Sequence, residues 1–379
     1  PEKFANHEPP KEEHTVPDYY RKDKNGISLV SLAGSWEEMG RQYGALLSAE
    51  LKDMYNRAVC GKLFGEYGCI EEDALVSARK LFNSYPFRFK DFFAGMEETS
   101  GLTLDQLELV NAVEFVSFSN GLLSGCSGVA VWGDYAQNGL VFGRNYDYCG
   151  WLKDFAKDFV FTAFHPADGS LAVLTASYAG EIYAVNGLNE KGIFLELNNG
   201  AFSGGTLSFE NRKSAVAELS ECLLDVSTLD EVDAFFQTVK SSFAYLIGVS
   251  DGQIARCYEW PTFGVELRKT HTRPGLIVLT NHFTEPSWGL PRPNDEKSFK
   301  TVERRDNLLT LAKHFKGSID VETMKGIMDT KLENGGSKFD ATVYQLVAEP
   351  GKLHIWFKVS DAQDWTLLDA KPLLRPRQA

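Results

Sequence analysis

A cysteine, an arginine and an aspartate fall close together within residues 122–147, and their side chains could form a nucleophilic site. Cys126 follows Gly125 at the head of an apolar run, and Arg144 and Asp147 close a second run. A positive neighbour stabilises a thiolate, which is the nucleophilic form of cysteine. The carboxylate of Asp147 is suited to accept a hydrogen bond from an amine. The stretch therefore predicts Cys126 as a nucleophile whose pKa is lowered by Arg144.

The same stretch predicts a β-hairpin. Two apolar runs, 127–133 and 140–146, flank a polar loop that contains an Asn-Gly pair. If the loop spans the residues between these runs, Cys126 lies opposite Asp147. Strict alternation puts Arg144 on the other face from Asp147, so we expect the strand to end or bulge between them.

A lone cysteine on an apolar strand is more often a small core residue than a nucleophile. Here the wider set of motifs favours chemistry: Gly125-Cys126-Ser127, Phe142-Gly-Arg-Asn-Tyr-Asp147, Gly187-Leu-Asn-Glu-Lys-Gly192, Leu197-Asn198-Asn199 and Leu279-Thr-Asn-His282. Together they resemble the N-terminal-nucleophile (Ntn) hydrolases of the bile salt (choloylglycine) hydrolase and penicillin V acylase group. The internal position of the cysteine resembles the isopenicillin N acyltransferase branch of that group, in which a precursor cuts itself before the cysteine.

The resemblance implies self-cleavage between Gly125 and Cys126, giving segments 1–125 and 126–379. Cys126 then carries both a thiol and an α-amine, which titrate near about 8.5 and about 8, so the amine can accept the thiol proton. Asp147 is expected to accept a hydrogen bond from that amine. We expect a self-processing amidase that hydrolyses a linear C–N bond through an acyl-thioester. The two segments are expected to remain associated.

The resemblance also implies the other members of the site. Asn198 is expected to donate to the oxyanion, with Asn199 as the alternative if the strand register slips by one residue. Asn281 is expected to position the amine or the substrate. A late arginine is implied as well, and we favour Arg304 over Arg305.

Three alternatives remain open at this point. An acyltransferase would use an amine or a thiol in place of water. A papain-like pair of Cys126 and His282 would need no self-cleavage. A binding protein on the same fold would carry an inert Cys126. No cofactor is expected: the seven histidines lack metal-ligand spacing, and no phosphate-binding glycine motif is present.

Composition limits the class of partner. Of the 379 residues, 43% are hydrophobic and 24% are charged, which is typical of globular proteins. The net charge of -13 argues against nucleic acid, which needs a basic face, so we expect a small-molecule amide substrate. No window approaches the ~20 apolar residues of a membrane span. Because the sequence begins at Pro1 rather than Met, we expect an exported (periplasmic or secreted) protein, with a cytoplasmic one as the alternative; a homo-oligomer and a Cys60–Cys69 disulfide both stay open.

Element patterns predict an α+β fold: a four-layer α/β/β/α sandwich, with an extended arm at 1–25, a mostly helical segment at 26–125 and a core at 126–379. The resemblance implies the same layering. Ser35-x-x-Glu38 predicts a capping box, Ser227-x-x-Asp230 another helix start, and Pro86 a break. Expected helices span 36–57, 70–97, 103–118, 211–224, 227–240, 298–314 and 320–329. Beyond the hairpin, expected strands span 27–32, 159–164, 171–176, 182–185, 192–197, 244–249, 254–259, 264–268, 276–280, 341–348 and 352–358.

Overall fold

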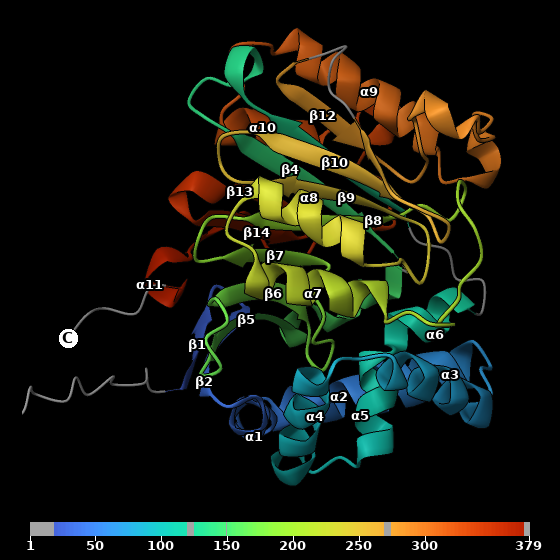
Figure 1. Cartoon of the computed structure of the whole chain (residues 1–379), viewed down its shortest axis with the longest axis vertical. Coiled ribbons are helices and arrows are strands. Elements are labelled where there is room, and N and C mark those ends of the chain that lie inside the picture. Colours follow the sequence, from blue (N-terminus) through green and yellow to red (C-terminus); the bar gives the residue numbers. More distant parts are fainter. Residues whose placement is uncertain (1–18, 120–124, 149, 269–273, 375–379) are drawn as a thin grey trace, which may run out of the picture.

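The computed structural model describes residues 19–119, 125–148, 150–268 and 274–374, and their strands form two sheets packed face to face (Figure 1). Aromatic side chains fill the space between the sheets. The rings of Phe142 and Phe194 lie 5.2 Å apart, and those of Phe159 and Phe357 stack at 4.4 Å. Each pair joins one sheet to the other, so the two facing surfaces are buried against each other.

Nine strands of the described chain form the larger sheet, in the order β1-β2-β5-β6-β7-β8-β9-β10-β11. Strands β2 and β5 run parallel, and every later neighbouring pair is antiparallel. The strands are β1 (Tyr20–Lys24), β2 (Ile27–Gly34), β5 (Phe159–Pro166), β6 (Val173–Tyr178), β7 (Asn186–Asn189), β8 (Phe194–Asn199), β9 (Tyr245–Ser250), β10 (Ala255–Trp260) and β11 (Glu266–Arg268).

The smaller sheet has six strands in the described chain, in the order β12-β3-β4-β13-β14-β15, and all its neighbours are antiparallel. The predicted hairpin forms its centre. The strands are β3 (Gly125–Val131), β4 (Val141–Asp147), β12 (Leu276–Leu279), β13 (Thr342–Glu349), β14 (His354–Val359) and β15 (Thr366–Asp369).

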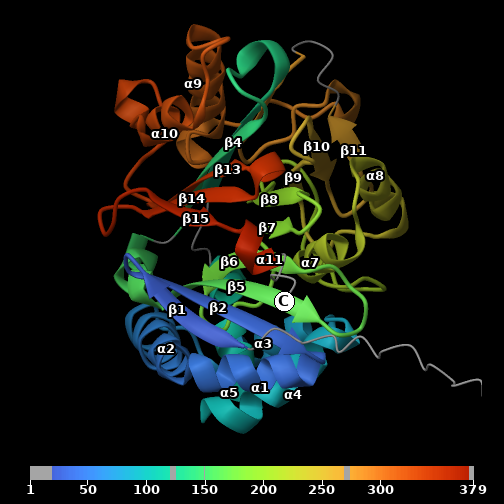
Figure 2. The same ribbon diagram turned by 90° about the vertical axis from the view of Figure 1, so that its left-hand side faces the viewer.

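Helices cover the outer face of each sheet (Figures 1 and 2). Helices α7 (Ala215–Asp225) and α8 (Leu229–Thr238) lie on the larger sheet. Helices α9 (Thr301–His314) and α10 (Val321–Asp329) lie on the smaller one. This arrangement confirms the predicted four-layer α/β/β/α sandwich.

The N-terminal helices gather at one end of the molecule, where α1 packs against β2 and β5 (Figure 2). Pro86 separates two of them, as predicted, because it cannot continue the preceding helix. The described helices are α1 (Trp36–Leu46), α2 (Ser48–Asp53), a π-helical segment (Met54–Glu66), α3 (Glu71–Asn83), α4 (Phe87–Ser100), α5 (Leu104–Asn111) and α6 (Val113–Ser119).

The start of α1 follows the predicted capping box. Ser35 accepts from the backbone of Glu38, and the Glu38 side chain accepts from the backbone of Ser35. Further along α1, Gly40 lies against α4. A Cβ atom at Gly40 would lie 2.0 Å from the carbonyl oxygen of Phe92, so only glycine allows these two helices this close approach.

The register of the hairpin differs from the prediction by one residue. Cys126 pairs with Tyr146, and Gly125, not Cys126, pairs with Asp147. The loop runs from residue 132 to 140 and contains a 3-10 turn, Gly133–Tyr135. The observed loop has nine residues, whereas the expected loop had six. Because the two lengths differ by an odd number, the pairing of the strands shifts by one residue.

Other local predictions also need correction. The strand expected at 182–185 lies at Asn186–Asn189, because a short apolar run does not distinguish a strand from a buried loop. Helix α8 begins one residue later than expected, with Thr228 and Glu231 forming its capping box. The polar β1 and the short β15 and α11 (Lys371–Leu374) have no expected counterpart. Of the expected arm, residues 1–18 lie outside the described residues.

The disulfide considered between Cys60 and Cys69 is not formed, because both are free thiols in the structure. None of the described helices combines the length and the apolar character needed to cross a bilayer.

Candidate active site

Cys126 lies where the smaller sheet loses one of its strands. Strand β12 ends at Leu279, which pairs with Gly128 of β3. Continuing this register places Asn281 beside Cys126. There the side chain of Asn281 takes the place of a strand partner, since its Oδ1 accepts from the backbone nitrogen of Cys126 at 3.0 Å. The nucleophile predicted from the sequence thus has its backbone held by a side chain at a sheet opening.

Arg304 completes this opening from helix α9. Its side chain is fully buried, and its Nη1 donates to the carbonyl oxygen of Cys126 at 2.8 Å. Its Nη2 donates to Asn281 Oδ1 at 2.7 Å. The neighbouring Arg305 is only partly buried and makes none of these contacts. Of the two arginines considered, Arg304 is the one that reaches the nucleophile.

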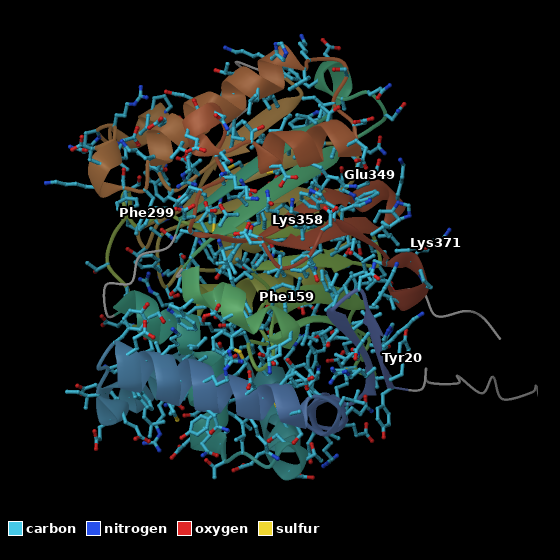
Figure 3. All side chains as sticks on the ribbon, turned by 180° about the vertical axis from the view of Figure 1, so that it is seen from behind. Tyr20, Phe159, Phe299, Glu349, Lys358 and Lys371 are labelled. Carbon is cyan, nitrogen blue, oxygen red and sulfur yellow. The ribbon has the colours of Figure 1, made fainter. Side chains whose placement is uncertain are left out.

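A strained turn before α9 positions Arg304. Phe299 and Lys300 both have positive φ, at 52° and 53°, which is unfavourable for residues with a Cβ atom. Arg304 Nε donates to the carbonyl oxygen of Phe299 at 2.8 Å. Phe299 lies at the N-terminal end of α9 (Figure 3). The strain fits a segment whose conformation is fixed by a functional side chain.

Asp147 lies beside Arg304, on the face of the sheet covered by α9. Its carboxylate accepts from Arg304 Nη1 at 3.2 Å and from the Thr342 hydroxyl at 2.6 Å. Burial raises the pKa of Asp147 to about 6, while Arg304 and Thr342 act in the opposite direction. The end or bulge expected in β4 between Arg144 and Asp147 is not found: β4 is continuous to Asp147, and the two side chains lie on opposite faces of it. The register shift lies on the neighbouring strand, between Thr342 and Tyr344 of β13.

Arg144 projects into the space between the two sheets. Its Nη2 lies 3.4 Å from Cys126 Sγ, which places the predicted cation beside the thiol. The same guanidinium donates to the backbone carbonyls of Val185 and Leu197 and to Asn186 Oδ1. In this uncleaved chain burial raises the pKa of the Cys126 thiol, although the Arg144 charge acts to lower it.

Glu196 is a member of the site that the sequence analysis missed. It is fully buried on β8, and its Oε2 lies 3.4 Å from Arg144 Nε. Gly128 leaves room for it, because a Cβ atom there would lie 1.9 Å from Glu196 Oε1. Burial raises the pKa of Glu196 to about 7, against the effect of Arg144. The sequence does offer a sign of this role, because Glu196 is a charged residue between apolar neighbours in the strand Phe194–Asn199.

The two asparagines at the end of β8 point in different directions, as alternation requires. Asn198 is fully buried, and its Nδ2 donates to the Leu279 carbonyl at 3.5 Å. Asn199 lines the same cavity as Cys126. Its backbone carbonyl accepts from Asn281 Nδ2 at 2.9 Å. Of the two asparagines, Asn199 and not Asn198 is therefore among the residues that line the cavity beside Cys126.

His282 is turned toward a neighbouring hydroxyl group. Its Nδ1 lies 2.9 Å from Thr301 Oγ1 and 3.4 Å from Thr280 Oγ1. The Cys126 sulfur is instead contacted by Arg144 Nη2 and by the backbone N–H of Asp147, which donates to it. The described geometry gives no Cys126–His282 pair of the papain-like kind.

An apolar cavity of about 100 Å³ opens beside Cys126. Its walls come from α3, α6 and α7, from β4, β8 and β9, and from the loops between them. Most of the lining is aromatic or aliphatic. Among the described residues, no group of three or more His, Cys, Asp or Glu side chains is placed to hold a metal ion. The aromatic part of the lining includes Phe115, Tyr146, Tyr183, Phe209, Phe243 and Tyr245.

No protein-family model and no curated protein matches the sequence. Solved structures do, and each belongs to the Ntn hydrolases that resemble choloylglycine hydrolase. A Caenorhabditis elegans ortholog of N-acylethanolamine-hydrolyzing acid amidase is 18% identical with a TM-score of 0.46, over 60% of this chain and 93% of its own. A variant of conjugated bile acid hydrolase from Clostridium perfringens is 15% identical with a TM-score of 0.45, over 65% and 92%. Penicillin V acylase from Agrobacterium tumefaciens is 12% identical with a TM-score of 0.44, over 67% and 90%. At these values the likeness carries no argument about function, which has to come from the site.

Proposed function

We propose that this chain is a self-processing cysteine amidase that hydrolyses a linear amide bond through an acyl-thioester on Cys126. One observation carries the proposal. The backbone nitrogen of Cys126 is held by Asn281, its thiol lies against Arg144, and both adjoin an apolar cavity. This arrangement suits a residue that uses its thiol as the nucleophile and its own nitrogen as the base.

Maturation would proceed by an N-to-S acyl shift. The Cys126 sulfur attacks the carbonyl carbon of Gly125, the peptide C–N bond breaks, and the freed nitrogen takes up a proton. Water then hydrolyses the thioester, leaving a carboxylate on Gly125 and a free thiol on Cys126. Gly125 suits this position because a Cβ atom there would lie 3.1 Å from Arg304 Nη2, a tight contact at the bond to be cut.

The mature site would then act on an external amide. The new α-amine, held by Asn281, accepts the thiol proton, and Arg144 stabilises the thiolate. The thiolate attacks the substrate carbonyl, and an asparagine at the end of β8 donates to the oxyanion. We favour Asn199 for this role, because it is the one of the two asparagines that lines the cavity. The amine product leaves, and water releases the acid from Cys126.

The N-terminal segment would stay in place after cleavage. Leu81 of α3 and Phe115 of α6 form part of the cavity wall. Their release would expose buried apolar surface, which is unfavourable at roughly 25 cal/mol per Å². Gel filtration of the cleaved protein should give one peak containing both fragments, and separation without denaturant would contradict this part of the proposal.

Intact mass measurement under denaturing conditions tests the proposal directly. Wild-type protein should give two masses that correspond to residues 1–125 and 126–379, whereas Cys126→Ala should give one uncut chain. Cleaved wild-type protein should also release amine from model amides. An uncut wild-type chain with full amidase activity would overturn self-processing. An uncut chain without amidase activity, whose Cys126 resists thiol reagents, would favour a binding protein.

A further inference from the structure

The cavity beside Cys126 contains one charged side chain among its described lining residues, and this is Glu114. The rest of the wall is mainly aromatic and aliphatic. A carboxylate placed in such surroundings is poorly solvated, so it is retained at a cost unless it has a partner. The proposed amide chemistry at Cys126 gives Glu114 no task.

Two tyrosines fix the position of Glu114. The Tyr146 hydroxyl donates to Glu114 Oε1, and the Tyr148 hydroxyl donates to the backbone carbonyl of Glu114. Tyr146 is also the strand partner of Cys126. The Glu114 carboxyl group therefore lies at the tip of the Tyr146 side chain, whose backbone is paired with that of Cys126.

A second carboxyl group, Glu181, lies close to Glu114. Glu181 is buried, and it accepts a hydrogen bond from the backbone of Glu114. The nearby cation is Arg144, which is already engaged by Glu196 and lies against the thiol. Burial raises the pKa of Glu114 to about 7, although the Tyr146 hydroxyl and the Arg144 charge act to lower it.

We propose that Glu114 binds a protonated amine on the acyl part of the substrate. The aromatic walls add to this preference, since the faces of Tyr and Phe rings attract cations. A cavity of about 100 Å³ is smaller than one that holds benzene, roughly 150 Å³, so the acyl chain is short. The substrate class is thus an amide of a short ω-amino acid. This inference rests on the proposed amidase function and names its substrate.

The same contact gives the N-terminal segment a part in recognition. Glu114 belongs to α6, on the far side of the proposed cut from Cys126. Substrate binding would then need both cleavage products, which is a second reason for them to stay together.

A pair of isosteric substrates tests the inference. The anilides of 4-aminobutyric acid and of valeric acid differ by an ammonium group in place of a methyl group. We expect cleaved wild-type protein to have a higher kcat/KM for the 4-aminobutyryl anilide. Glu114→Gln keeps an acceptor for Tyr146 but removes the charge. It should lower the ratio of the two kcat/KM values by about 10- to 100-fold, as expected for a hydrogen bond to a charged group. Glu108→Gln, which removes another buried carboxyl of the N-terminal helices outside the cavity, should leave the ratio unchanged.

Binding of the free acids tests the role of Glu114 separately from the amidase function. We expect 4-aminobutyrate to raise the melting temperature of the protein more than valerate does, and Glu114→Gln to abolish the difference. Preferential binding without hydrolysis of either anilide would support the contact between Glu114 and an ammonium group, but it would overturn the amidase function and with it the substrate class. Hydrolysis with equal or better use of the valeryl anilide, or a ratio unchanged by Glu114→Gln, would overturn the inference and leave the amidase standing.

Discussion

Asn281 Oδ1 accepts a hydrogen bond from the backbone nitrogen of Cys126 at 3.0 Å, across 155 residues of chain. That nitrogen is the atom that becomes the α-amine if the chain cuts itself. The same oxygen accepts from Arg304, which also binds the carbonyl of Cys126. The nitrogen and the carbonyl oxygen of Cys126 are therefore both held before any bond is broken, which is the preorganisation that an intramolecular acyl shift requires.

Asn281→Ala should slow self-cleavage. The variant loses the acceptor that holds the departing nitrogen, and a hydrogen bond of this kind contributes about 10- to 100-fold in rate. The fraction of cut chain against time after refolding measures the effect. Asn145→Ala is a matched control, because Asn145 is another fully buried asparagine whose contacts are to Met328, Ser337 and Gln345. Equal slowing in both variants would assign the effect to general destabilisation.

Arg144→Met should both destabilise the protein and reduce the reactivity of Cys126. Removing one partner of a buried ion pair leaves Glu196 uncompensated, at a cost of about 4 kcal/mol. The loss of the cation should also raise the pKa of the thiol. Denaturant unfolding measures the first effect, and the pH dependence of alkylation by iodoacetamide measures the second.

The double variant Arg144→Met/Glu196→Gln separates these two effects. It removes the orphaned charge, so stability should largely recover, whereas the pKa of Cys126 should stay high. Recovery of both properties would mean that Arg144 has only a structural role.

The sequence predicts the parts of the site that are close in the chain better than those that are distant. Cys126 and Arg144 lie in one hairpin, so the sequence brings them close together, but the predicted register put their side chains on opposite faces. The observed register, shifted by one residue in the loop, puts both side chains on the face between the two sheets. Arg304 reaches Cys126 across 178 residues, and no periodicity carries that information. It was identified only through the family resemblance.

Two other residues were not predicted from the sequence, for a different reason. Glu114 and Glu196 are acidic, and an acidic residue is usually exposed. Their burial depends on how the two sheets and α6 pack, which is a tertiary property. Asn198 and Asn199 show the same limit, because adjacent residues differ only in the face of the strand on which they lie.

Asp158 should make stability depend on pH. Burial and the neighbouring Asp53 raise its pKa from 3.8 to about 8. The folded state therefore keeps a proton that the unfolded chain releases, from about pH 4 to about pH 8. Stability should fall as pH rises through this window, with a contribution of up to about 1.4 kcal/mol per pH unit. Asp158→Asn should then gain melting temperature relative to wild type between pH 5 and pH 8, while the exposed Asp154→Asn should show no such trend. A constant difference across this range would contradict the assignment.

Asn199→Ala should lower turnover without a matching loss of stability. If its side chain donates to the oxyanion, the variant loses an interaction made mainly in the transition state, which costs about 10²- to 10³-fold in kcat with little change in KM. Asn198→Ala serves as the matched control. Its amide is buried against the Leu279 carbonyl, so its loss should lower the melting temperature and leave turnover per folded molecule nearly intact. Self-cleavage passes through its own oxyanion, so activity must be expressed per cleaved molecule. The opposite result, with turnover lost in Asn198→Ala and kept in Asn199→Ala, would assign the oxyanion donor to Asn198. Retention of turnover in both variants would mean that the end of β8 does not stabilise the oxyanion.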